Sequence, residues 1–148
     1  MAIPPFDENG NLPKGTWEAT IEEVRERFGA YPTRRRMQFG FLMDAIAILK
    51  EVGCTTLFLD GSYVTEKILP GDFDALVLSS ENGGEAITKI EEKLIHVPQK
   101  YRGEFYCAED LAYDRYLKKT VTFLELFQTE WNNRSELIRK GIIQIQIT

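Results

Sequence analysis

The stretch that decides the fold is LFLDGSYVTEKILPGDFDALV, residues 57–77. Leu57, Phe58 and Leu59 are apolar, and the two threonines before them are β-branched. This run predicts a short strand over residues 55–60. That strand ends abruptly at Gly61 and Ser62, residues typical of a turn. A Pro-Gly turn follows, and residues 72–79 then predict a second strand. The segment is therefore expected to be two strands joined by a loop that carries polar side chains.

Those polar side chains fit one chemistry. Glycine lets the backbone turn closely and expose N–H groups, which together with the Ser62 hydroxyl can cradle a phosphate beside Gly61. Asp72 and Asp74 stand at i and i+2, so a strand places both carboxylates on one face, where they repel unless a cation lies between them. Hard oxygen ligands suit Mg²⁺, with Mn²⁺ as the alternative. Lys67 lies between the two motifs, where it is either a ligand for a triphosphate or a surface lysine.

The rest of the chain supplies the layers of a domain. The clearest helix is predicted from about Arg34 to Val52, because Thr33 caps it, Gly53 stops it and its apolar positions form a wide face. Helical spacing also predicts a helix that begins at Thr16 and ends at Gly29. The remaining expectations are helices over 84–95 and 122–131 and strands over 103–108 and 141–148, with residues 109–120 ambiguous. This order predicts an α/β (α+β) layer fold with a short mixed sheet and helices packed on it.

Composition bounds the class of protein. A chain of 148 residues with 43% hydrophobic and 28% charged residues predicts one globular domain over 16–148, preceded by an irregular Pro- and Gly-containing arm over 1–15. The net charge of −5 argues against a protein that coats nucleic acid. Only two cysteines, no secretory signal and no apolar stretch long enough for a membrane span favour a cytoplasmic protein without a membrane partner.

The Gly61-Ser62 turn followed by Asp72-Phe73-Asp74 resembles the nucleotidyltransferase superfamily that includes DNA polymerase β. The closer resemblance is to the minimal nucleotidyltransferases of bacteria and archaea, and in particular to a group of small bacterial members. The segments that carry this narrower likeness are Ile3 to Phe6, Arg34 to Arg36, Leu59 to Thr65, Leu126 to Gln128 and Lys140 to Ile142. The resemblance therefore spans nearly the whole chain.

The resemblance implies roles for individual residues. Gly61 and Ser62 would hold the β- and γ-phosphates of a nucleoside triphosphate, and Asp72 and Asp74 would hold Mg²⁺. Active members take a third carboxylate, an aspartate, from a later strand. Glu104 is its best counterpart here, as a ligand or as a base toward the acceptor hydroxyl, and it departs from the family by one methylene. The chain also has Asp60 before the Gly-Ser turn, either as a turn cap or as a further ligand.

Two functions of different classes follow. The first is Mg²⁺-dependent transfer of a nucleoside monophosphate from a triphosphate to a protein or RNA acceptor, such as a partner toxin or a tRNA, in the manner of an antitoxin. The alternative is a catalytically inactive member of the fold that binds a nucleotide or a partner. The three arginines Arg34, Arg35 and Arg36 are either a solvated helix start or a contact for a phosphate or an RNA.

Overall fold

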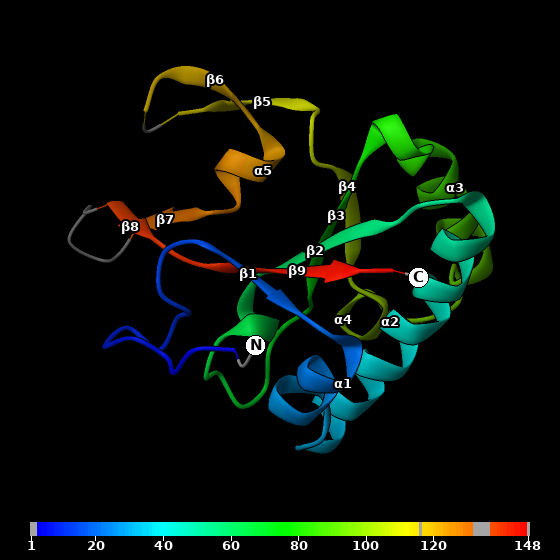
Figure 1. Ribbon diagram of the computed structural model, residues 1–148, viewed down its shortest axis with the longest axis horizontal. Coiled ribbons are helices and arrows are strands. Elements are labelled where there is room, and N and C mark those ends of the chain that lie inside the picture. The colour runs from blue at the N-terminus through cyan, green and yellow to red at the C-terminus, as the bar shows by residue number, and fades with distance from the viewer. Residues whose placement is uncertain (1–2, 116, 132–136, 148) are drawn as a thin grey trace.

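The structure is a computed structural model that describes residues 3–115, 117–131 and 137–147. It is a mixed α+β fold built on a five-stranded sheet with the order β1-β9-β2-β3-β4 (Figure 1). The five strands are β1 (Thr16–Ala19), β9 (Ile142–Gln146), β2 (Thr56–Asp60), β3 (Asp74–Val77) and β4 (Glu104–Cys107). The outer pairs β1–β9 and β3–β4 are parallel, and β9–β2 and β2–β3 are antiparallel. The expected mixed sheet is confirmed.

One face of this sheet carries the main core. The helices that cover it are α2 (Thr33–Val52) and α3 (Gly83–Lys93), on the right of Figure 1, with the short α1 (Ile21–Val24) and α4 (Gln99–Arg102) beside them. Leu57 and Leu59 of β2 point to this face and pack in one cluster with Leu42 and Leu49 of α2. Gly53 ends α2 in a left-handed conformation, with φ 100°, as the sequence predicted.

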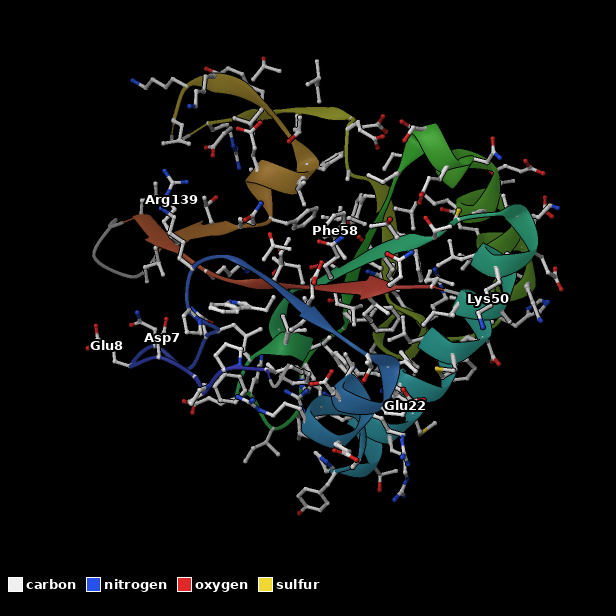
Figure 2. All side chains as sticks on the ribbon, viewed as in Figure 1. Asp7, Glu8, Glu22, Lys50, Phe58 and Arg139 are labelled. Carbon is white, nitrogen blue, oxygen red and sulfur yellow. The ribbon has the colours of Figure 1, made fainter. Side chains whose placement is uncertain are left out.

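The opposite face is covered by the later part of the chain. Because strand side chains alternate, Phe58, which is labelled in Figure 2, points away from α2, as does Leu76. Phe123 and Phe127 pack against their cluster. The elements on this side are α5 (Phe123–Leu126) and two hairpins, β5 (Leu111–Asp114) with β6 (Lys119–Thr122) and β7 (Thr129–Trp131) with β8 (Leu137–Arg139). Figure 1 shows the β5–β6 hairpin at the top of the view and the β7–β8 hairpin at its left.

Two predicted helices are wrong in part. Thr16–Ala19 is a strand, because it pairs in parallel with β9 in the register Thr16↔Ile142. The helix begins after Thr20, whose hydroxyl accepts from the Glu23 N–H while the Glu23 carboxylate accepts from the Thr20 N–H, and it continues as a π-helix over Arg25–Gly29.

The predicted helix over 122–131 lasts only one turn, and the chain then pairs with β8 as β7. The ambiguous residues 109–120 contain β5 and the start of β6, except position 116, which lies outside the described residues.

The N-terminal segment from residue 3 to residue 15 carries no helix or strand, yet it contributes to the core. Ile3 and Leu12 are buried in the main cluster, and Arg27 donates hydrogen bonds to the carbonyls of Ile3 and Pro4. Both cysteines, Cys54 and Cys107, are free and buried. Within the described residues, no helix has both the length and the apolar character to cross a membrane.

Candidate functional site

Three carboxylates lie side by side across three neighbouring strands. Asp60, at the end of β2, is the register partner of Asp74, at the start of β3, and Asp74 is the register partner of Glu104, at the start of β4. Register partners share a face of a sheet, so all three side chains lie on the face of Phe58 and Leu76, away from α2. We call Asp60, Asp74 and Glu104 the acidic row.

The Gly-Ser turn touches this row. Gly61 has φ 83°, a left-handed value that glycine adopts without strain. A Cβ atom at this position would lie 2.7 Å from Oδ2 of Asp74, so only a glycine fits there without displacing that carboxylate. Ser62 begins a single 3-10 turn, Ser62–Val64, and its hydroxyl donates to the carbonyl of Asp72 at 3.5 Å. The turn expected to hold phosphates and the carboxylates therefore form one site.

Asp72 does not lie on the strand that the sequence predicted for it. β3 begins at Asp74, because the partner strand β2 ends at Asp60 and the chain turns away at Gly61. The Asp72 carboxylate nevertheless reaches the same site, where its Oδ2 accepts a hydrogen bond from the Gln99 amide at 3.2 Å. Burial raises the pKa of Asp72, the Gln99 hydrogen bond opposes that shift, and Glu104 adds to it.

Asp74 is the electrostatic centre of the site. Burial, followed by the charges of Asp72, Asp60 and Glu104, raises the pKa of Asp74 to about 7, and Lys140 opposes the shift. Lys140 reaches the site from the segment before β9, with its Nζ 3.8 Å from Oδ1 of the fully buried Asp60. The negative charges of three neighbouring carboxylates favour the binding of a cation or of a proton at Asp74.

Two polar side chains hold Glu104. The Gln99 amide donates to Oε1 of Glu104 as well as to Asp72, and the Tyr106 hydroxyl donates to Oε2 of Glu104. Burial and this hydrogen bond, with the charges of Glu104, Asp74 and Asp72, raise the pKa of the Tyr106 phenol. Glu104 therefore points toward Asp72 and Asp74 rather than away from them.

Lys67 and Arg35, which the sequence suggested as phosphate contacts, do not have that placement in the structure. The side chain of Lys67 is exposed, and what holds this residue is its backbone carbonyl, which accepts from Arg35. Arg35 is only 5% exposed, so neither a solvated arginine nor a phosphate contact describes it. Its guanidinium donates to the carbonyls of Phe28, Tyr63 and Thr65 as well, and thereby fixes the segment that follows the Gly-Ser turn.

The donor set suits a hard divalent cation, because the groups at the site are carboxylate oxygens. Within the described residues, no group of three or more His, Cys, Asp or Glu is spaced as a ready-made metal site. The Gln99 side-chain amide donates to both Asp72 and Glu104 and therefore lies between these two carboxylates. Its N–H groups are the positive end of a dipole, and they take the place that a cation would otherwise have. Asp72, Asp74 and Glu104 carry oxygen ligands of the kind that Mg²⁺ takes, and their side chains would have to move before the three could hold one ion.

Sequence reasoning missed Gln99, Tyr106 and Lys140 and left Asp60 open. Tyr106 had a usable signal, because it stands at i+2 from Glu104 on a predicted strand and must share its face. Asp60 also had a usable signal. If the strands predicted over residues 55–60 and 72–79 pair in antiparallel fashion, Asp60 lies close to the aspartates of the second strand. Lys140 stands in a segment that carries the resemblance, but nothing in the sequence pointed to Asp60 as its partner, since only the placement of β9 brings the two together.

The chain was also compared with models of known protein families. A family of unknown function, DUF6932, matches residues 4–146, so the chain belongs to this family. No curated protein and no solved structure matched the chain.

Proposed function

We propose that this member of DUF6932 is a divalent-cation-dependent nucleotidyltransferase, which moves a nucleoside monophosphate from a nucleoside triphosphate to a hydroxyl of a protein or an RNA. The observation that carries the proposal is the contact between the Gly-Ser turn and the acidic row: a Cβ atom at Gly61 would lie 2.7 Å from Oδ2 of Asp74. A phosphate held by this turn would lie against Asp74, so the two functions predicted from separate motifs meet at one place.

Each group of residues at the site has its own role in the proposed reaction. Gly61 allows close approach of the backbone, and its neighbour Ser62 has a hydroxyl that can turn from the Asp72 carbonyl toward a phosphate oxygen. Asp72, Asp74 and Glu104 would hold Mg²⁺, which when bound neutralises the charge of the triphosphate and of the departing pyrophosphate. Lys140 is the cation that already lies in the site, beside Asp60, and it orients a negatively charged ligand over the turn.

Glu104 is the base in this proposal. It lies at the open end of the acidic row and already accepts a hydrogen bond from a hydroxyl, that of Tyr106. An acceptor hydroxyl that replaced the Tyr106 contact would have its proton directed at Oε2 of Glu104. Asp74 is less suited to this task, because it lies between Asp60 and Glu104 in the acidic row rather than at its open end.

The test is transfer of a label from each of the four nucleoside triphosphates, labelled at the α-phosphate, in the presence of Mg²⁺ or Mn²⁺. A lysate of host cells supplies acceptors, and the double variant Asp72→Asn/Asp74→Asn is the control. A labelled protein or RNA that requires both aspartates supports the proposal. A folded wild-type protein that labels nothing with any nucleotide contradicts it.

A second candidate is a catalytically inactive nucleotidyltransferase-fold protein that binds a nucleotide or a partner. The observation in its favour is that Tyr106 and Gln99 already occupy both oxygens of Glu104. Under this alternative the protein binds a labelled triphosphate in equilibrium dialysis, and the Gly61→Ala variant does not, while neither transfers the label.

A further inference from the structure

β4 is an open edge of the sheet. Among the described strands it pairs only with β3, through bonds that include the Glu104 N–H to the Phe73 carbonyl at 3.0 Å and the Ala108 N–H to the Val77 carbonyl at 2.8 Å. Alternate residues of a parallel strand bond to the same neighbour, so the N–H and C=O of Phe105 point away from β3. No hydrogen bond within the described part of the chain engages these two groups of Phe105.

A cavity lies along this edge. Its volume is about 210 Å³, and its walls come from β4 and from the helices α3 and α4. Ile90, Leu94 and Phe105 give it an apolar side, and the exposed Glu91 lies at its border. Gln99 and Glu104 line the cavity and also belong to the candidate site, so the two are continuous. An edge with free backbone groups beside a cavity is the arrangement to which an extended peptide adds as a strand.

The register of the sheet says where such a peptide would place its side chains. The acidic row runs from Asp60 through Asp74 to Glu104 and stops at the open edge. A strand added to β4 would continue the row by one residue, whose Cβ would lie about 4.5–5.5 Å from that of Glu104 on the same face. A serine or threonine hydroxyl at this position is within reach of the Glu104 carboxylate, and larger side chains would extend past it.

We infer that the cavity between α3 and β4 is an acceptor site for an extended polypeptide, which adds to β4 as a strand and places a serine or threonine beside Glu104. This inference rests on the proposed nucleotidyl transfer. In the reaction the serine or threonine oxygen forms a bond to the α-phosphorus, and the bond between that phosphorus and the pyrophosphate oxygen breaks. Pyrophosphate leaves with the electron pair, and the hydroxyl proton passes to Glu104.

Charge favours a polypeptide over a nucleic acid at this place. The cavity is lined by two carboxylates, Glu91 and Glu104, against one cation, Arg102, and the carboxylates of the acidic row and Asp72 lie beside it on a chain of net charge −5. Phosphodiester groups of an RNA would be repelled by these carboxylates, whereas a neutral or basic peptide backbone would not.

The experiment uses two pools of short synthetic peptides of random sequence, one with a fixed central serine or threonine and one with alanine there, and total tRNA as a third acceptor. Label transfer from the triphosphates is measured for wild type and for Glu91→Trp, which fills the cavity. The matched control is Glu92→Trp, the same change at the next residue of α3, which is also exposed and does not line the cavity. Amide exchange of Phe105 is measured separately, without nucleotide.

We expect label in the serine/threonine pool and none in the alanine pool. Glu91→Trp should lower the labelling about tenfold, the equivalent of one or two lost backbone hydrogen bonds, and Glu92→Trp should leave it unchanged. Both pools should slow the exchange of the Phe105 amide, because docking needs only the peptide backbone. Label confined to tRNA, or peptide labelling equal in the two tryptophan variants, overturns the inference.

Failure of the proposed function has a different signature. If no acceptor is labelled under any condition, nucleotidyl transfer is wrong, and the exchange measurement alone decides the docking site. Protection of Phe105 by both pools then supports peptide docking at β4, and unchanged exchange overturns it.

Discussion

The left-handed backbone of Gly61 brings its α-carbon so close to Asp74 that a methyl group there would lie 2.7 Å from the carboxylate oxygen Oδ2. Gly61→Ala should therefore both strain the turn and displace Asp74. We expect a loss of about 1 to 3 kcal/mol in the free energy of unfolding and loss of triphosphate binding. Urea denaturation and equilibrium dialysis measure the two effects.

The control for this variant is Gly71→Ala. Gly71 lies in the same connecting loop, its φ is not left-handed, and a Cβ there would meet no atom within 4 Å. It should change neither stability nor binding by a measurable amount. Equal behaviour of the two variants would show that the Gly61 contact has no role.

Asp74 makes the stability of the chain depend on pH. Its pKa rises from 3.8 to about 7 in the folded chain, so the folded state prefers the protonated carboxyl. The stabilisation from this proton is fully present below about pH 3.8 and is lost as the pH rises through about 7. Asp74→Asn should be more stable than wild type by roughly 2 kcal/mol at about pH 8, with a smaller difference at about pH 5.

The measurement is urea unfolding in the presence of a chelator at both pH values. Asp44→Asn, the same substitution at an exposed position of α2, serves as the control and should leave the wild-type pH dependence in place. A pH dependence in Asp74→Asn equal to that of wild type would contradict the assignment.

Gln99 keeps two carboxylates together in the absence of a cation. Removing its amide in Gln99→Ala leaves Asp72 and Glu104 to repel each other, so the melting temperature without metal should fall. Mg²⁺ should then raise the melting temperature more in Gln99→Ala than in wild type, because the cation takes over the role of the amide. Gln99→Glu, which adds a further carboxylate, should show the same pattern more strongly.

Gln146→Ala removes an exposed glutamine of β9 and is the matched control for these melting curves. Its response to Mg²⁺ should equal that of wild type. If Gln99→Ala also gave the wild-type response, a cation would not be binding between Asp72 and Glu104.

Arg35 holds the loop after the Gly-Ser turn from inside the protein. Arg35→Lys keeps the charge but loses the planar fork that serves the carbonyls of Tyr63 and Thr65. We expect a loss of about 3 kcal/mol in unfolding free energy, since hydrogen bonds to charged groups are among the stronger ones and buried carbonyls are left unpaired. Arg36→Lys, at an exposed position of the same helix, should be close to neutral in the same denaturation assay.

Local signals predicted the elements that local interactions determine. α2 and its Gly53 end, the strands β2 and β3 and the Gly-Ser turn all follow from neighbours in sequence, and the structure has them within a few residues of their predicted limits. Thr16–Ala19 followed a helical spacing and was still a strand, because pairing with β9, more than a hundred residues later, outweighs that preference.

The site shows the same division. Asp74 and Glu104 were expected together from a resemblance, and the sheet register places them opposite each other. Gln99 precedes its strand and reaches back to Asp72 across 27 positions, a contact that no spacing rule describes. Arg35 was expected to act with Arg34 and Arg36, as a solvated helix start or as a phosphate or RNA contact. The sequence does not distinguish it from its two neighbours, because its burial depends on carbonyls that surround it only in the folded chain.

The position of β9 has a consequence for how the protein assembles. Residues 142–146 lie between strands formed by residues 16–19 and 56–60, so the middle of the sheet is completed by the segment most distant from both in the chain. Strand pairing between segments so distant in sequence is slow and strongly cooperative. A folding intermediate with its helices formed would still lack the β9 strand beside β2. Lys140 arrives beside Asp60 in the same event, so the charges of the site are balanced only when the whole sheet has closed.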